Sequence, residues 1–286
     1  MKLAIIQTSY SENIDEKLAK KVKEASKKAD LIILQELHQS PYFCITENPK
    51  NFDYAENFES NLKFWGEVAK ENSVVLVTSL FEKRAEGLYH NTAFVFEKDG
   101  TIAGKYRKMH IPDDPAYYEK FYFTEGDLGF NPIETSVGKL GVLICWDQWF
   151  PEASRMMAMA GAEILIYPTA IGFLDEEPIE EQRSQLERWL TIQKSHSIAN
   201  GLPVATANRI GFEPDPSKNL KGITFWGNSF ILNAKGEEIA KASETEDEIL
   251  YAEVLKSETK EMRDMWSFFR DRRIEDYSEL TKRWRD

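Results

Sequence analysis

Short apolar runs alternate along the chain with longer segments in which apolar residues recur every three or four positions. The runs are typical of buried strands, and the periodic segments are typical of helices with one buried face. Their regular alternation predicts an α/β fold. The expected strands lie at residues 3–7, 31–34, 74–81, 92–96, 101–106, 140–144, 164–167, 203–207, 229–232, 237–240 and 249–254, and the expected helices at 14–29, 58–72, 151–160 and 179–199.

Two pairs of these strands are joined by tight turns and resemble each other in sequence. The segment NTAFVFEKDGTIAGK begins at Asn91 and the segment NSFILNAKGEEIAK begins at Asn228, with Gly100 and Gly236 in the turns. Glycine at such a turn is a hairpin signal. The echo is either a chance match between two hairpins or the trace of a duplication. A duplication would give two similar α/β halves that pack sheet against sheet.

Composition limits the classes of partner. Lys and Arg number 36 among 286 residues, Asp and Glu number 48, and the formal net charge is −12. This charge argues against nucleic acid or an anionic membrane surface as a partner. Two cysteines do not form a disulfide framework, and no stretch reaches the ~20 apolar residues of a membrane span. The low cysteine content favours the thiol-reducing cytosol, and the apolar N-terminal run is too short for a signal peptide, so we expect a cytoplasmic protein.

The domain organisation is expected to be simple. No linker rich in Pro, Gly or Ser divides the chain, which predicts one domain over residues 1–255. Residues 256–286 form a charged and aromatic tail. Aromatic residues at this density need burial, either on the same chain or on another subunit, and we expect a homo-oligomer. The methionines and aromatic residues of the tail are Met262, Met265, Trp266, Phe268, Phe269, Tyr277 and Trp284.

One reactive side chain stands at the end of a predicted buried strand and before a predicted helix. Cys145 follows residues 140–144 directly. Ligands gather at the carboxyl ends of strands in open α/β sheets, and free backbone N–H groups at a helix start stabilise a thiolate or an oxyanion. The alternative is a small core residue, which is the interpretation we favour for Cys44.

Two charged side chains follow other predicted strands. Glu36 comes after residues 31–34, where partial burial raises the pKa of a carboxyl toward the range of a general base. Lys108 comes after residues 101–106 and offers a fixed positive charge for an oxyanion or a neighbouring thiol. The alternatives are an exposed loop glutamate and a surface lysine. Four histidines without paired spacing make a zinc site improbable.

These residues together resemble the carbon–nitrogen hydrolase (nitrilase) superfamily. The matching segments, within a resemblance that reaches from Ala4 to about Val254, are Leu34–Leu37, Tyr106–His110 and Gly141–Glu152. The resemblance implies a four-layer αββα sandwich of two mixed sheets flanked by helices. It also implies that Glu36 is the base, Lys108 the oxyanion stabiliser and Cys145 the nucleophile. A second glutamate of such enzymes positions the reactants, and Glu119 occupies the matching position.

The expected chemistry follows from these roles. The Cys145 thiolate attacks a carbonyl carbon, and Lys108 and the backbone N–H of Trp146 hold the oxyanion. Glu36 protonates the departing nitrogen and then activates water against the thioester. Because one carboxyl works in both directions, the reaction needs no metal or organic cofactor.

Longer segments point to a substrate. Residues 110–123, 145–153 and 167–172 resemble those of N-carbamoylputrescine amidases, which implies hydrolysis of a ureido group to putrescine, CO2 and ammonia in polyamine biosynthesis. A cationic substrate needs a carboxylate or an aromatic face at its ammonium end. The resemblance becomes weak over residues 173–181, which include an acidic segment at 175–181 that is expected to be a solvated loop. The candidates for the ammonium end are Tyr42, Trp146, Asp147, Glu176 and Glu177.

Other functions remain open at this stage. Another ω-amidase or a β-ureidopropionase-like carbamoyl amidohydrolase would use the same reactive groups. A carboxylated substrate would need an arginine, for which Arg209 is a candidate, although it also fits a structural ion pair. An inactive scaffold that binds polyamines or a partner protein is the alternative of another class, and the presence of Glu36, Lys108 and Cys145 argues against it.

Overall fold

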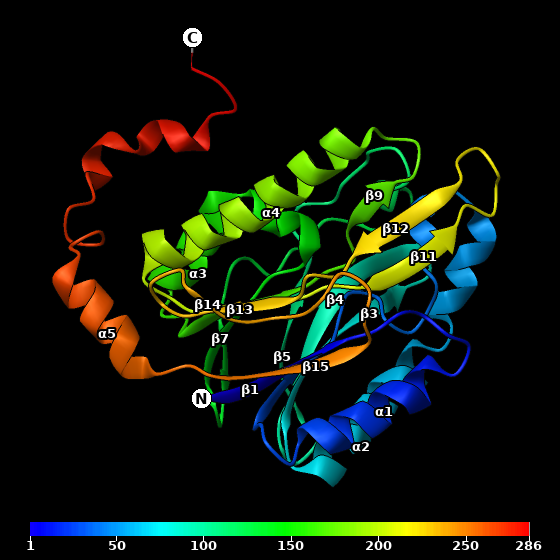
Figure 1. Cartoon of the computed structure of the whole chain (residues 1–286), viewed down its shortest axis with the longest axis horizontal. Helices are drawn as coiled ribbons and strands as arrows, with labels where there is room; N and C mark the ends of the chain where they lie inside the picture. Colours follow the sequence, from blue (N-terminus) through cyan, green and yellow to red (C-terminus); the bar gives the residue numbers. More distant parts are fainter. Residues whose placement is uncertain (286) are drawn as a thin grey trace.

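Two six-stranded mixed sheets pack face to face at the centre of the computed structural model, which describes residues 1–285 (Figure 1). The strands of the first sheet are β1 (Lys2–Gln7), β2 (Leu31–Ile33), β3 (Val75–Ala85), β4 (Leu88–Phe96), β5 (Ile102–Arg107) and β15 (Glu248–Glu253). Their order is β15–β1–β2–β3–β4–β5. The helices α1 (Ile14–Ala25) and α2 (Phe58–Asn72) cover the outer face of this sheet.

The second sheet has its own pair of covering helices. Its strands are β6 (Ile133–Thr135), β7 (Gly138–Val142), β8 (Ile164–Pro168), β10 (Val204–Ala207), β13 (Phe230–Leu232) and β14 (Glu238–Lys241). Their order is β14–β13–β10–β8–β7–β6. The helices α3 (Pro151–Met159) and α4 (Ile179–Asn200) lie on the side away from the first sheet. The four layers therefore run helix, sheet, sheet, helix, as the resemblance implied.

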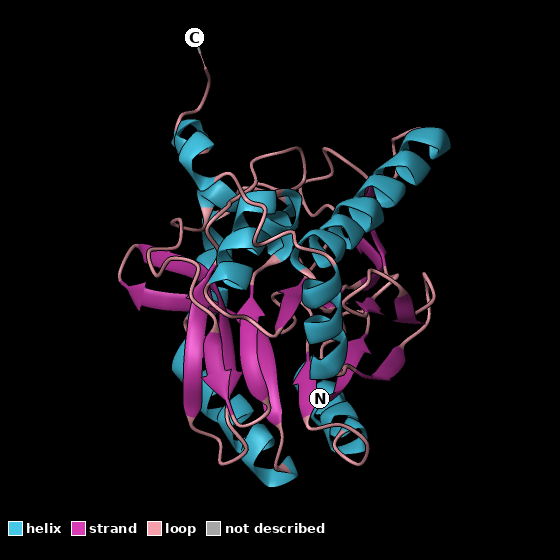
Figure 2. Ribbon diagram, turned by 90° about the vertical axis from the view of Figure 1, so that its left-hand side faces the viewer, coloured by secondary structure: helices cyan, strands magenta, loops and turns pink. Residues whose placement is uncertain are grey.

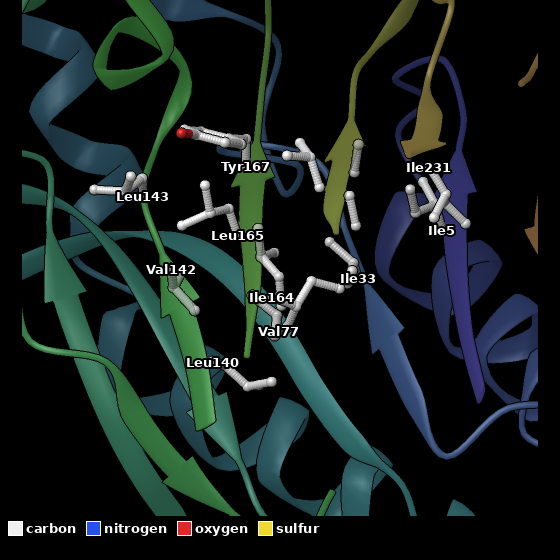
Figure 3. Packing of buried hydrophobic residues seen from close by; sticks show 14 of the residues in the cluster. Ile5, Ile33, Val77, Leu140, Val142, Leu143, Ile164, Leu165, Tyr167 and Ile231 are labelled. Atoms are coloured by element: carbon white, nitrogen blue, oxygen red, sulfur yellow. The ribbon is translucent and has the colours of Figure 1, made fainter. Parts of the chain in front are cut away.

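Alternation along the inner strands explains the layers. Leu3 and Ile5 of β1 face the second sheet, whereas Ala4 and Ile6 face α1 and α2. Each parallel strand is thus buried on both faces, which is why it is continuously apolar in sequence. Figure 3 shows Ile33 and Val77 of the first sheet beside Ile164 of the second, and all belong to one buried cluster.

The two sheets share one topology. In the first, β1, β2 and β3 are parallel, β15 pairs antiparallel with β1, and β4 and β5 form an antiparallel hairpin beside β3. In the second, β7, β8 and β10 are parallel, with β6 on one side and the β13–β14 hairpin on the other. The two hairpins whose sequences resemble each other occupy equivalent positions. This equivalence favours duplication over chance.

Some boundaries differ from the sequence prediction. Helix α1 ends at Ala25 rather than residue 29. The Ser26 hydroxyl donates to the carbonyl of Lys23, a local bond that competes with the next helical turn. The predicted acidic loop extends only over residues 175–178, because α4 begins at Ile179.

A third, small sheet was not predicted from the sequence. Its strands pair in the order β11–β12–β9, and they are β9 (Gly172–Leu174), β11 (Ile210–Pro214) and β12 (Gly222–Trp226). Gly172 allows the close approach of β9 to β12, since an added Cβ would lie 2.4 Å from the carbonyl oxygen of Thr224. This sheet places Gly172 and Trp226 beside the ends of the inner strands.

The C-terminal tail leaves the body of the molecule (Figure 2). It contains α5 (Lys256–Met265) and two 3-10 helices, η5 (Ile274–Asp276) and η6 (Ser278–Thr281). Arg263 donates to the carbonyl of Asn200 at 3.1 Å, and the Phe269 ring lies 4.8 Å from the guanidinium carbon of Arg263. Beyond this anchor Trp284 is 82% exposed. Within residues 1–285 no helix is long and apolar enough to cross a membrane.

Candidate active site

Glu36 lies between the two sheets, beyond the end of β2. Its carboxylate is fully buried. Oε1 accepts hydrogen bonds from Asn91 Nδ2 at 2.7 Å and from Lys108 Nζ at 2.8 Å, and Oε2 accepts from the backbone N–H of Ala170 at 2.9 Å. Leu37, the next residue, has φ of +44° and turns the chain sharply. Glu36 is therefore an interior carboxylate held by three donors, not an exposed loop residue.

Lys108 follows β5 directly, and its backbone N–H donates to the carbonyl of Asn91 at 2.9 Å. The ammonium is fully buried and lies 2.8 Å from Glu36 Oε1 and 2.6 Å from Glu119 Oε2. Burial opposes the charged form, but the carboxylates of Glu119 and Glu36 outweigh it and raise the pKa of Lys108 well above its ordinary value. The ammonium is therefore a fixed positive charge inside the protein.

Glu119 lies at the start of a short 3-10 helix, η3 (Glu119–Phe121), and its side chain is fully buried. Burial raises the pKa of its carboxyl to about 7, although Lys108 opposes the shift. The hydroxyl of Tyr42 donates to Glu119 Oε1 at 2.8 Å. Tyr42, expected at the ammonium end of a substrate, instead supports a carboxylate of the buried cluster.

Cys145 begins a 3-10 turn, η4 (Cys145–Trp149), three residues after β7 ends. Its φ of +41° is a left-handed conformation that a side chain rarely adopts, and such strain is concentrated at functional sites. Sγ lies 4.0 Å from the carbonyl oxygen of Ala170. Burial raises the pKa of the thiol, Glu36 raises it further, and Lys108 opposes them. The thiolate form of Cys145 is therefore disfavoured by its surroundings.

Asp147 is the main correction among the candidate residues. Its carboxylate is fully buried, and both oxygens are occupied by protein donors. Oδ2 accepts from the backbone N–H of Ile144 and from the Tyr106 hydroxyl, each at 2.9 Å. Oδ1 accepts from the backbone N–H of His110 at 3.1 Å and lies 2.6 Å from His110 Nδ1. Asp147 therefore holds the turn that carries Cys145 and has no oxygen left for a substrate.

One residue in the loop after β8 of the second sheet joins these groups. Ala170 donates its N–H to Glu36 and directs its carbonyl oxygen toward Cys145. The thiol therefore shares one buried region with the cluster of Glu36, Lys108 and Glu119. Glu36 and Lys108 follow strands of the first sheet, whereas Cys145 and Ala170 follow strands of the second. Among residues 1–285 there is no group of three or more His, Cys, Asp or Glu side chains arranged to hold a metal ion.

A cavity of about 420 Å³ is lined by sequence neighbours of this cluster, although Glu36, Lys108, Glu119 and Cys145 do not themselves line it. Trp146, adjacent to Cys145, lines it, as do Ile171 and Gly172, which follow Ala170. We call this cavity the mouth. Its other aromatic and charged lining residues are Asp114, Tyr117, Trp149, Glu177, Glu181, Arg188 and Trp226. The mouth therefore combines aromatic walls with an excess of carboxylates.

Glu176 and Glu177, the other two acidic candidates, differ in whether they line the mouth. Glu177 lines the mouth, and its carboxylate accepts from Gln185 Nε2 at 2.8 Å and from the Leu174 N–H at 3.3 Å. Glu176 is exposed and is not among the lining residues; its Oε1 accepts from the backbone N–H of Lys221 at 2.7 Å.

Comparison with known proteins now decides the family. A family model described as carbon-nitrogen hydrolase matches residues 2–264. The chain belongs to the carbon-nitrogen hydrolase family. A crystal structure of a carbon-nitrogen hydrolase from Helicobacter pylori G27 superimposes with a TM-score of 0.98 at 56% identity, covering 100% of this chain and 99% of the other.

Two curated relatives of this carbon-nitrogen hydrolase carry different substrate names. A citrullinase of Francisella tularensis is 40% identical over 290 residues and covers 99% of both chains. An N-carbamoylputrescine amidase of Oryza sativa is 42% identical over 277 residues, which is 94% of this chain and 89% of the relative. The names agree on a C–N hydrolase and differ in the substrate.

Several residues of the carbon-nitrogen hydrolase site were not found from the sequence. Asn91, which holds Glu36, begins the repeated hairpin segment, and that echo was the available signal. Arg188 lies on a helix that was predicted without reference to the site. Arg209, considered for a carboxylate, is fully buried and donates to the carbonyl of Leu37 at 2.8 Å and to Glu213 at 2.6 Å. It supports the turn after Glu36.

Proposed function

We propose that this protein is a cysteine-dependent amidohydrolase that cleaves the ureido group of N-carbamoylputrescine to putrescine, CO2 and ammonia. The observation that carries the proposal is the buried cluster of Glu36, Lys108 and Glu119 beside Cys145, below an acidic and aromatic mouth. The family establishes a hydrolase that acts on C–N bonds, and the choice of substrate rests on the mouth.

The first half of the reaction forms a covalent intermediate. Because burial raises the pKa of the Cys145 thiol, Glu36 accepts the thiol proton as Sγ attacks the ureido carbonyl carbon. The C=O electron pair moves onto oxygen, where the Lys108 ammonium and the Trp146 backbone N–H stabilise the charge. Losing one such donor typically costs about 3 kcal/mol. The oxyanion then collapses, Glu36 protonates the departing nitrogen, and ammonia leaves a thiocarbamate on Cys145.

The second half regenerates the thiol. Glu36, again a carboxylate, removes a proton from water as its oxygen attacks the thiocarbamate carbon. The C–S bond breaks, and the proton returns from Glu36 to Sγ. The carbamate that is released decomposes to CO2 and putrescine. Glu119 stays bound to Lys108 and Tyr42 throughout and keeps the ammonium in place.

The mouth suits a cationic distal end. Asp114, Glu177 and Glu181 supply three negative charges and Arg188 one positive charge, so the net charge of the lining is −2 (1 − 3). The faces of Trp146 and its aromatic neighbours add cation–π attraction. Of the residues considered for the ammonium, Trp146 and Glu177 remain in the proposal.

Citrulline is a second candidate, because a guanidinium also lines the mouth. Citrulline is N-carbamoylputrescine with a carboxylate on the carbon that carries the ammonium. Arg188 is the cation of the lining that such a carboxylate can meet. The name of the Francisella relative points in the same direction.

The test is ammonia release from a panel of N-carbamoylputrescine, citrulline, N-carbamoyl-β-alanine and an ω-amide, with Cys145→Ala as the blank. We expect N-carbamoylputrescine to have the highest kcat/KM. Faster turnover of a carboxylated substrate or an ω-amide would contradict the proposed substrate but would leave the reaction class unchanged. No turnover of any of them above the blank would favour the scaffold that only binds polyamines or a partner.

We further propose that the protein forms a homo-oligomer through its tail. Met265 is 77% exposed, Trp266 55% and Trp284 82%, although each has a large apolar side chain. Exposed apolar surface of this kind marks an interaction site. The tail is anchored on the body at Arg263 and Phe269 and so presents these side chains on a fixed base.

A further inference from the structure

One face of α4 forms a charged rim on the mouth. Glu181, Gln185 and Arg188 stand at helical spacing and line the cavity together. Arg188 NH2 donates to Glu181 Oε1 at 2.5 Å, and Arg188 Nε donates to the carbonyl of Ser184 at 3.1 Å. The guanidinium is therefore already paired within its own helix.

The same rim reaches the acidic side of the mouth. Gln185 Nε2 donates to Glu177 Oε1 at 2.8 Å and to Glu181 Oε1 at 3.4 Å. Glu181 is thus placed between a partner cation and a network that ends at Glu177. While Glu181 binds Arg188, their charges offset each other, and the unpaired charges of the mouth are the carboxylates of Asp114 and Glu177.

The ion pair is open to exchange. The side chains of Arg188 and Glu181 are 57% and 48% exposed, and an exposed ion pair contributes little net stability because water solvates and screens both charges. A substrate carboxylate that enters the mouth can therefore compete with Glu181 for the guanidinium. The two candidate substrates differ only by such a carboxylate, so the state of this pair bears directly on the choice between them.

We propose that the Glu181–Arg188 ion pair determines whether the enzyme accepts a ureido substrate with a carboxylate beside its ammonium. With the pair closed, Arg188 is neutralised and the mouth prefers a simple ammonium. With Arg188 released, the guanidinium receives the carboxylate of an α-amino acid. This inference rests on the proposed function and assigns its substrate selectivity to two residues.

The test compares kcat/KM for N-carbamoylputrescine and citrulline in the wild type and in two variants. Glu181→Gln frees Arg188 and is expected to raise the ratio of citrulline to N-carbamoylputrescine turnover by about threefold to tenfold, the range of one partly exposed charged contact. Arg188→Gln is expected to shift the ratio by a similar factor in the opposite direction. Its KM for citrulline rises, and its KM for N-carbamoylputrescine falls.

Matched controls come from the same helix. Glu180 and Arg183 are exposed and do not line the mouth, so Glu180→Gln and Arg183→Gln should leave the ratio within twofold of the wild type. The inference is overturned if Glu181→Gln and Arg188→Gln also leave the ratio within twofold while the wild type hydrolyses either substrate. If the wild type hydrolyses neither, the proposed function fails first, and the inference fails with it.

Discussion

The Glu36 carboxylate accepts a 2.9 Å hydrogen bond from the backbone N–H of Ala170, which lies 134 positions further along the chain. The carbonyl of the same alanine lies 4.0 Å from Cys145 Sγ. A backbone group cannot be removed by a side-chain substitution. The relative position of acid and thiol therefore depends on the packing of the two sheets, as well as on Asp147, which holds the turn that carries Cys145.

Replacing Glu36 should lower the catalytic rate and, at the same time, lower the pKa of the Cys145 thiol. Glu36→Gln removes the base, and kcat/KM should fall at least about 10²-fold. It also removes a negative charge that raises the pKa of the Cys145 thiol, so alkylation of Cys145 by iodoacetamide should begin at lower pH than in the wild type. The measurement is the pH dependence of adduct mass on the Cys145 peptide. An unchanged alkylation profile would show that the two groups do not interact.

The nucleophile can be tested by trapping. Cys145→Ser should lower turnover at least about 10³-fold, because a hydroxyl beside Glu36 is a much weaker nucleophile than a thiol. A slow ureido substrate should leave a carbamoyl adduct on the wild type in intact-mass spectra and none on Cys145→Ala. An adduct on Cys44 instead would show that Cys44 is the nucleophile and would contradict the role of Cys145.

The pKa of Glu119 predicts a pH dependence. The carboxylate must be ionised to hold the Lys108 ammonium, and its pKa is raised to about 7. The kcat/KM of the wild type should therefore rise as pH increases through about 7, and Glu119→Gln should lose this limb together with most of its activity. A limb that is identical in Glu119→Gln would assign the titration to another group.

The free energy of unfolding should fall as pH increases through the same range in which kcat/KM rises. The pKa of Glu119 in the folded state lies above the ordinary 4.5, so its neutral form is favoured by folding. The stabilisation is fully present below about pH 4.5 and is lost as pH rises through about 7, by up to about 3 kcal/mol. Denaturant unfolding at pH 5 and pH 8 measures the difference, which should be smaller in Glu119→Gln.

Asp147 should matter for stability and activity without contacting substrate. Asp147→Asn places an amide where four donors meet carboxylate oxygens, so buried donors lose an acceptor, at about 2–3 kcal/mol. We expect a lower unfolding midpoint and a lower kcat with little change in KM. Asp113→Asn, at an exposed aspartate three positions after His110, is the control. A large rise in KM alone would return Asp147 to the substrate site.

The tail predicts a mass in solution above the 33.1 kDa of one chain. Light scattering at micromolar concentration measures it. Replacing Trp266 and Trp284 with serine should lower the mass toward that of the monomer while leaving the fold intact, because both side chains lie on the exposed tail. A monomeric wild type would contradict the proposed assembly.

Local sequence patterns predicted the α/β class and the individual reactive residues, whereas the four-layer arrangement came from the family resemblance. Continuous apolar runs predicted strands buried on both faces, and Glu36, Lys108 and Cys145 each stood at or near a strand end. Glu119 came from the resemblance alone. The location in the cytosol, expected from the cysteine content, stays a prediction.

The mouth was harder to predict because side-chain direction there depends on distant partners. Tyr42 is close to Glu36 in sequence, and Asp147 is close to Cys145. In the structure, however, Tyr42 donates to Glu119, and Asp147 accepts from the backbone N–H of Ile144. The sheet of β9, β11 and β12 is built from short strands that contain Gly and Pro, and the pairing of β9 with β12 joins residues about fifty positions apart. Arg188 lay on a well-predicted helix, but only the fold brings it to the mouth.

The division of the reactive groups between two equivalent sheets has a consequence for mutational sensitivity. Glu36 and Lys108 follow strands of one sheet and Cys145 follows a strand of the other, so these three groups meet only at the seam, the interface between the two halves. A buried substitution that lets one half slide against the other by a fraction of an ångström can leave a well-folded protein with no reaction. Inactivating substitutions should therefore also be found far from Cys145, among the apolar side chains that pack between the two sheets and fix their relative position.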